Sequence, residues 1–191
     1  MSNRTANYSA FYVKEPFDPS NLGANATPDF RYYRMLQAWK GKYNSFYFVD
    51  AHGKTYNVRD GSKWPTLQNR LHERLSVSKN IVLFLSFNTK RSQALTEEME
   101  YGILTKGLPV IVVYPELDCY NYFTLFKEQI SSLWDRLPAF RNNMDQVATL
   151  HIPFKLEFVQ QALNDDRFAV RTMAEPGRYY YKSPALKLTS F

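Results

Sequence analysis

Two nearly continuous apolar runs constrain the fold of this chain most strongly. They are "NIVLFLSF" at residues 80–87 and "LPVIVVYP" at residues 108–115. Strands without polar alternation are typical of parallel sheets, because helices cover both faces of such a sheet. The segment between the two runs has a candidate helix cap at Ser92 and a candidate helix end at Gly107. The order strand, helix, strand predicts a parallel βαβ unit.

The same alternation extends over most of the chain. Further strands are expected at 8–13, 45–50 and 147–153, and further helices at 28–39, from Pro65 onward, at 122–136 and at 154–164. This pattern predicts an α/β fold, a flavodoxin-like, doubly wound parallel sheet of five strands between two layers of helices, in the order 2-1-3-4-5. Ligands of such sheets bind beyond the carboxyl ends of the strands.

Length and composition indicate one globular domain. The chain has 191 residues, of which 45% are hydrophobic and 22% charged, so it can bury a sizeable core. We expect a domain over residues 1–165, followed by a C-terminal extension over residues 166–191. The extension is expected to pack on the domain or on a partner.

Several classes of protein are excluded by what the sequence lacks. A single cysteine, Cys119, allows no internal disulfide and favours the cytoplasm. The first residues, "MSNRTANYSAF", lack the apolar core of a signal peptide, and the apolar run 81–85 is too short to span a membrane. The three histidines lack metal-ligand spacing, so no metal is expected, and no cofactor fingerprint is present. The net charge of +6 comes from scattered residues, so no nucleic-acid partner is expected.

Three glutamates, Glu97, Glu98 and Glu100, lie in the helix expected between the two apolar runs. At about 100° per residue, Glu97 points opposite to the apolar stripe, and Glu100 lies about 120° from its centre, so both are expected in solvent. Glu98 lies only about 80° from that centre, at the margin of the buried face. Gly102 follows one turn later on the same side, where a close approach of backbone or ligand would explain a glycine. Glu98 is therefore either an ion-paired edge residue or a functional acid.

The order and spacing of these residues resemble the TIR-like domains, in particular the ThsB type of Thoeris anti-phage systems. In that family a strand ends in serine and a glutamate follows about twelve residues later on the next helix, which matches Ser86 and Glu98. "DGSKW" at 60–64 is similar to an Asp-x-Ser-x-Trp segment of ThsB-type proteins, and "SAFYV" lies where the first strand meets a substrate-facing loop. Ala94 differs, because many TIR domains have tryptophan there. The resemblance covers about residues 8–115.

The resemblance implies an enzyme that cleaves the nicotinamide–ribose bond of NAD⁺, either alone or only after a trigger, with Glu98 as the catalytic residue. Substrate-binding residues would be Phe11, Tyr12, Asp60, Trp64 and Ser86, and NAD⁺ would be a substrate rather than a cofactor. The ADP-ribose part would become a nucleotide signal for an effector protein. A homo-oligomer is also implied.

Two alternatives remain from the sequence. "EYGILTKGLP" is similar to the acid, Gly and Gly-x-Pro pattern of nucleoside deoxyribosyltransferases, with Glu100 as the acid and a spacing one residue too short. The second alternative is a TIR-like interaction module without catalytic activity. Such a module would not need an acid at the margin of a pocket.

Overall fold

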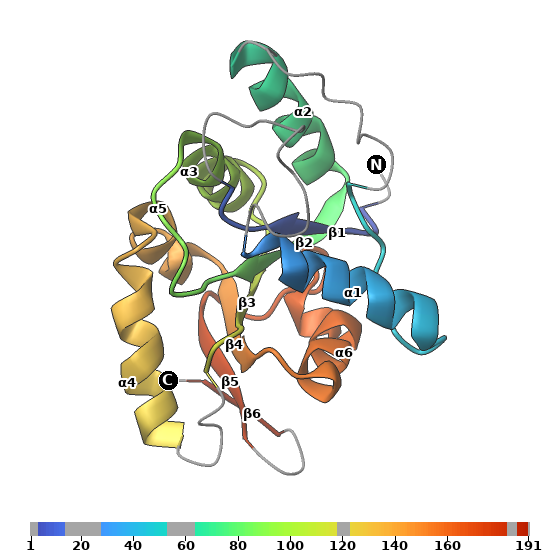
Figure 1. Cartoon of the computed structure of the whole chain (residues 1–191), viewed down its shortest axis with the longest axis vertical. Coiled ribbons are helices and arrows are strands. Elements are labelled where there is room, and N and C mark those ends of the chain that lie inside the picture. Colours follow the sequence, from blue (N-terminus) through green and yellow to red (C-terminus); the bar gives the residue numbers. More distant parts are fainter. Residues whose placement is uncertain (1–3, 14–27, 53–63, 118–122, 183–186, 191) are drawn as a thin grey trace.

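The computed structural model describes residues 4–13, 28–52, 64–117, 123–182 and 187–190 of the chain (Figure 1). The predicted substrate-binding residue Asp60 and the single cysteine, Cys119, lie outside these residues.

A six-stranded sheet with the order β1-β2-β3-β4-β5-β6 forms the centre of the fold (Figure 1). The first five strands are parallel, and β6 is antiparallel to β5. The strands are β1 (Ala6–Ala10), β2 (Ser78–Phe84), β3 (Val110–Tyr114), β4 (Ala148–Pro153), β5 (Gly177–Lys182) and β6 (Lys187–Ser190). The two apolar runs form β2 and β3 in the interior of the sheet, which confirms the predicted parallel α/β fold.

The segment 45–50 is not the full strand that we predicted. It lies beside β1, where the predicted strand order places it, but forms only one parallel bridge, from Asp50 to Asn7. Backbone bonds to β1 are made through Asn7, whose N–H donates to the carbonyl oxygen of Val49 and whose carbonyl oxygen accepts from the N–H of Ala51. The backbone N–H of Phe48 donates locally, to the carbonyl oxygen of Phe46. The side-chain oxygen of Asn7 accepts a hydrogen bond from the backbone N–H of Val49 at 2.9 Å. The fifth parallel strand is β5, from the C-terminal part of the chain.

The helices follow the predicted alternation with the strands. They are α1 (Phe30–Lys42), α2 (Trp64–Ser76), α3 (Gln93–Glu100), α4 (Phe123–Trp134), α5 (Pro138–Arg141) and α6 (Leu156–Asn164). The hydroxyl of Ser92 caps α3 by accepting from the backbone N–H of Leu95 at 3.1 Å. A π-helix, η2 (Tyr101–Thr105), continues α3 and ends before Gly107, whose φ of 60° favours glycine. Among the described helices, none has both the length and the apolar character needed to cross a membrane.

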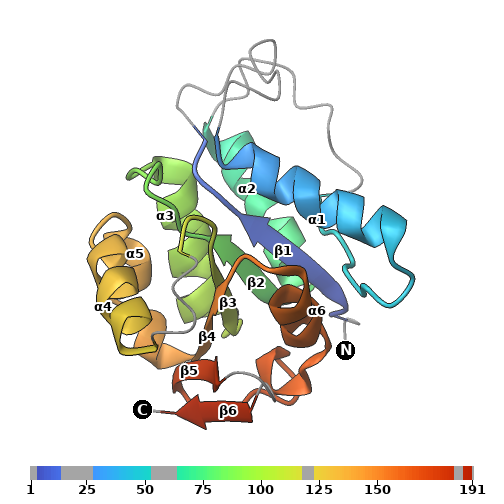
Figure 2. The same cartoon turned by 60° about the horizontal axis from the view of Figure 1, so that its bottom comes forward.

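The hydrophobic core lies on both faces of the sheet. Helices α2 to α5 pack on one face, against the side chains of Tyr8, Ile81 and Val112. Helices α1 and α6 pack on the other face, against Phe84 and Ile111. Figure 2 shows α3, α4 and α5 on one side of the sheet and α1 and α6 on the other. This three-layer arrangement places α2 and α3 next to each other, over β1 and β2.

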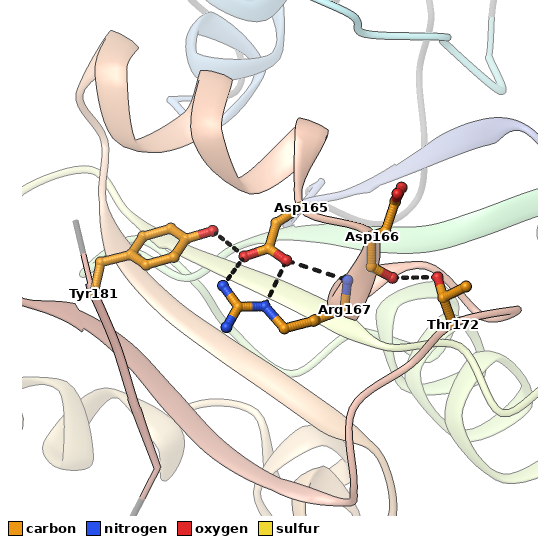
Figure 3. A network of polar contacts seen from close by, with 5 residues as sticks. All are labelled: Asp165, Asp166, Arg167, Thr172 and Tyr181. Atoms are coloured by element: carbon orange, nitrogen blue, oxygen red, sulfur yellow. Dashed lines mark hydrogen bonds and ion pairs between the residues drawn. The ribbon is translucent and has the colours of Figure 1, made fainter. Parts of the chain in front are cut away.

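Polar contacts around Asp165 join the end of α6 to β5 (Figure 3). The guanidinium of Arg167 donates to both carboxylate oxygens of Asp165, at 2.8 and 2.7 Å, and the hydroxyl of Tyr181 donates to Oδ2 at 2.8 Å. Next to them, the hydroxyl of Thr172 donates to the carbonyl oxygen of Asp166. Burial raises the pKa of Asp165, but the hydrogen bonds from Arg167 and Tyr181 outweigh it and hold the pKa below its usual value.

Asp165→Asn is expected to lower the free energy of unfolding at pH 7 by about 1–3 kcal/mol, because the four hydrogen bonds from Arg167 and Tyr181 lose their charged acceptor. The Asp165 side chain is only 9% exposed, so water cannot replace these bonds. The loss should shrink as the pH falls through the lowered pKa of Asp165, where the wild-type carboxylate also becomes protonated. Asp166→Asn is the matched control, because Asp166 takes part through its backbone carbonyl. Denaturant unfolding that gives equal values for both variants would contradict the role of Asp165.

Candidate active site

Glu98 lies in the second turn of α3 and points toward the sheet. The residue is 8% exposed, and its helix neighbours Leu95 and Met99 are buried in the core. Glu100, two residues later, is exposed on the outer side of the same helix. The helical angles therefore predicted correctly which of these two carboxylates faces the core.

The prediction for Glu97 was wrong, because this side chain does not lie free in solvent. Its Oε1 is 2.6 Å from Nε2 of His72 on α2, and the Glu97 side chain is 23% exposed. The ring of His72 stacks on Tyr101 of η2, with centroids 3.5 Å apart. A hydrogen bond from Gln68 lowers the pKa of Glu97. Burial opposes this shift, and the contact with His72 adds to it. A helical angle reports direction around one helix and could not reveal that α2 packs beside α3.

The carboxyl group of Glu98 is hydrogen-bonded to Tyr8, the middle residue of β1. The Tyr8 hydroxyl donates to Oε1 of Glu98 at 2.7 Å, and Tyr8 has no exposed surface. Burial raises the pKa of Glu98 to about 8, although the bond from Tyr8 and the positive charge of Arg74 on α2 oppose this shift. Burial, together with the nearby Glu98, raises the pKa of Tyr8 well above its usual value. A carboxyl group that titrates near neutral pH is typical of acids and bases in enzyme active sites.

His52 lies directly beside this pair. Its ring is 4.8 Å from the ring of Tyr8, measured between centroids, and 5.9 Å from that of Tyr33 on α1. Nη1 of Arg74 is 3.3 Å from Nδ1 of His52. Burial and the positive charge of Arg74 lower the pKa of His52 to about 4, so the imidazole is neutral near pH 7. Tyr8 of β1 and Arg74 of α2 therefore act on Glu98, and His52 lies against both of them.

An open hollow of about 390 Å³ lies between the first turns of α2 and α3. It is lined by Trp64, Arg91, Ser92, Gln93, Thr96 and Glu97. The predicted substrate-binding residue Trp64 thus borders a concave surface next to Glu97. Glu98 does not line this hollow, since its side chain turns from it toward Tyr8. The groups whose pKa values burial and charge shift most here, Glu98, Tyr8 and His52, are not among the residues that line the hollow.

The predicted residue Ser86 is buried at the carboxyl end of β2, with its hydroxyl bonded to Asp29. Ser86 Oγ donates to Oδ1 of Asp29, just before α1, at 2.7 Å. The hydroxyl of Thr89 accepts from the backbone N–H of Ser86 at 2.9 Å. Burial raises the pKa of Asp29 to about 6, against the hydrogen bond from Ser86. Ser86 therefore holds the loop after β2 against the start of α1.

The predicted aromatic residues Phe11 and Tyr12 point to opposite faces of the sheet. Phe11 packs on the α1 face, where its ring stacks on Tyr33 at a centroid distance of 5.5 Å. Tyr12 packs on the face that carries α2 and α3. Among the described candidates, Tyr12 and Trp64 therefore share the face of Glu98, whereas Phe11 packs on the opposite one.

No three histidine, cysteine or acidic side chains among the described residues come together in a way that could hold a metal ion. The model of the family "Thoeris protein ThsB, TIR-like domain" matches residues 8–119, more than half of the chain. The chain belongs to this ThsB family. It is thus a TIR-like component of Thoeris anti-phage defence. The matched region begins within β1 and contains β2, β3 and Glu98, while β4, β5 and β6 follow it.

The partners of Glu98 in this ThsB-family chain were missed by the sequence analysis. Tyr8 was placed only as the first residue of a strand, and His52 and Arg74 received no role. The partners are far apart in sequence: Tyr8 and Glu98 are separated by 90 positions. Only the packing of α2 and α3 over β1 brings them together. The one available signal was Tyr8 itself, because a tyrosine within a strand expected to be buried needs a hydrogen-bond partner for its hydroxyl.

Gly102 of this ThsB-family chain permits close contact with β2 and α2. A Cβ atom at Gly102 would lie 2.5 Å from Cδ1 of Ile81 and 3.4 Å from Cδ2 of Leu75. The close approach expected from the sequence is thus made by side chains of the core. Gly102→Ala gains up to about 1 kcal/mol of helix propensity, but overpacking costs about 1–3 kcal/mol. We expect a net loss of stability, measured by denaturant unfolding.

Two further variants test the Gly102 contact. Gly41→Ala in α1 is the matched control, since nothing lies within 4 Å of the added Cβ, and it should not lower stability. Adding Ile81→Val to Gly102→Ala removes the clashing Cδ1 and should recover part of the loss. A Gly102→Ala variant as stable as Gly41→Ala would show that Ile81 adjusts without cost.

Proposed function

We propose that this chain cleaves the nicotinamide–ribose bond of NAD⁺ and that Glu98 is its catalytic residue. The observation that carries the proposal is a buried carboxyl group with a pKa near 8, in a chain of the ThsB family. Within a Thoeris system, the ADP-ribose product or a nucleotide made from it would be the signal that activates an effector protein.

The reaction suits a single carboxylate. When the bond from C1′ of the ribose to the nicotinamide nitrogen breaks, the electron pair leaves with neutral nicotinamide and needs no proton. Positive charge then develops on C1′ and the ring oxygen, and a nearby carboxylate stabilises it. The same carboxylate then accepts the proton of the attacking water or hydroxyl group. Both roles require the ionised form of Glu98.

Glu98 is mostly protonated near pH 7, so its ionisation depends on the positive charges that act on it. Arg74 lowers the pKa of Glu98, and the nicotinamide ring of bound NAD⁺ carries a positive charge that would lower it further. Tyr12 and Trp64, on the same face as Glu98, are proposed to stack on the rings of the substrate. Phe11, Asp60 and Ser86 are proposed to complete the binding region at the carboxyl ends of the strands.

Release of nicotinamide is the direct test of this function. Purified protein is incubated with NAD⁺, alone and with extract of phage-infected cells as a trigger, and nicotinamide is quantified by chromatography. The proposal predicts nicotinamide in at least one condition. A parallel incubation with a deoxynucleoside and a free base tests the alternative, and base exchange without NAD⁺ loss would contradict the proposal. The exposure of Glu100, the acid of that alternative, does not favour it.

A further inference from the structure

His52 is held rigidly by three elements around the edge of the sheet. Its backbone N–H donates to Oδ1 of Asp50 at 2.8 Å. Asp50 in turn accepts from the Tyr33 hydroxyl of α1 at 2.5 Å, and it is bridged to Asn7 of β1. The His52 ring lies between the rings of Tyr8 and Tyr33. Little freedom is left for the imidazole to rotate.

The hydrogen bonds of the His52 ring determine its tautomer. Nε2 lies 2.9 Å from the carbonyl oxygen of Ser9, which can only accept, so Nε2 carries the proton. Nδ1 of the neutral ring is then an acceptor, and it faces Nη1 of Arg74 at 3.3 Å. A cationic imidazole would have N–H groups at both positions and would repel the guanidinium. The observed geometry therefore requires neutral His52.

We infer that His52 and Arg74 form a positioning pair. Neutral His52 packs its ring against Tyr8, whose hydroxyl binds Glu98, and it holds the guanidinium of Arg74 at 3.3 Å, so that the positive charge of Arg74 is fixed at this buried group, where Glu98 ionises. This inference rests on the proposed function for its catalytic meaning, but the electrostatic pair can be measured without it. Neither residue is proposed to touch the substrate. His52 acts through Arg74, and Arg74 acts through Glu98.

The groups that face Glu98 support this assignment. Tyr8 of β1 donates a hydrogen bond to its carboxyl group, and Arg74 of α2 lowers its pKa. On α3 itself, Glu97 is paired with His72, and Glu100 is exposed. Because the pKa of His52 is about 4, His52 remains an acceptor for Arg74 over the whole range in which Glu98 titrates. Among the residues that the structure describes, Arg74 is the basic residue whose charge lowers the pKa of Glu98.

The test follows the ionisation of Glu98 directly. The full chain is labelled with ¹³C at the glutamate carboxyl carbons and titrated by NMR, and Glu98→Gln assigns the signal. Arg74→Gln should lower the acid dissociation constant of Glu98 by about two- to tenfold, which is up to one pKa unit upward. Arg74→Lys keeps the positive charge and should restore most of the wild-type acid dissociation constant of Glu98. His52→Leu should shift the pKa in the same direction, whereas His52→Asn keeps an acceptor near Nδ1 and should recover part of the shift.

The matched control is His72→Asn, because His72 also lies on α2 but pairs with Glu97 instead of Glu98. It should leave the titration of Glu98 unchanged. If the protein cleaves NAD⁺, the acid limb of its pH–rate profile should move upward with the same variants. If the pKa of Glu98 shifts in these variants but wild type does not cleave NAD⁺, the positioning pair is supported and the proposed function is overturned. Unchanged titration of Glu98 in folded Arg74→Gln, with melting curves like wild type, would overturn the positioning pair.

Discussion

Glu98→Gln is expected to abolish NAD⁺ cleavage, with kcat falling by at least about a hundredfold, the usual cost of losing an electrostatic group that stabilises the transition state. Glutamine keeps the shape of the side chain, and its amide oxygen still accepts the hydrogen bond from Tyr8. It lacks the negative charge that stabilises the developing positive charge on the ribose. At neutral pH the melting temperature should change little, because a carboxyl group with a pKa near 8 is mostly protonated there and resembles an amide.

The neighbouring glutamates are the controls for this variant. Glu100→Gln, on the exposed side of α3, should retain activity within a few fold. Glu97→Gln should do the same, since the glutamine oxygen can still accept a hydrogen bond from His72. If Glu98→Gln is fully active and Glu100→Gln is inactive, the TIR-type assignment of the acid fails and the deoxyribosyltransferase-like register is correct.

The second large effect concerns the dependence of stability on pH. The pKa of Glu98 is about 8 in the folded chain against 4.5 for an unperturbed glutamate, so the folded state binds the proton more tightly. The stability from this group is fully present below about pH 4.5, decreases above it, and is lost as the pH rises through about 8. The loss reaches up to about 1.4 kcal/mol for each pH unit between the two values. Glu98→Gln does not titrate and avoids this loss.

Thermal unfolding of wild type and Glu98→Gln at pH 5.5 and pH 8.5 measures this difference. The melting temperature of the variant should rise relative to wild type between the two pH values. Glu100→Gln should keep a constant difference from wild type. A constant difference for Glu98→Gln as well would mean that Glu98 titrates near its ordinary pKa and that its burial has no electrostatic consequence.

The fold was predicted well wherever local patterns determine structure. The two apolar runs became β2 and β3, and the cap at Ser92 is present at the start of α3. The segment 45–50 alternates buried Phe46 and Phe48 with exposed Tyr47 and Val49, as a strand does. Its backbone nevertheless pairs with β1 at Asn7 and makes a local bond at Phe48, and side-chain alternation does not predict where such pairing stops.

The candidate site was predicted in part. The angle of Glu98 on its helix placed it correctly at the core margin, because that property depends on one helix only. Its bond to Tyr8, the proximity of Arg74 and the neutral state of His52 depend on packing between segments distant in sequence. The same limitation explains why the prediction for Glu97 was wrong, since its partner His72 lies on another helix. Local periodicity predicts the direction of a side chain around its helix but not which residues of other elements it contacts.

The most direct test of the central claim, that Glu98 carries out NAD⁺ cleavage in defence, is mass spectrometry of nucleotides from phage-infected cells. Cells expressing wild type, Glu98→Gln or Glu100→Gln are extracted before and during infection. We expect wild type and Glu100→Gln to lose NAD⁺ and to gain nicotinamide and an ADP-ribose-derived nucleotide, while Glu98→Gln, at equal protein level, shows none of these changes. The same new nucleotide in cells with Glu98→Gln, at wild-type amounts, would contradict the claim.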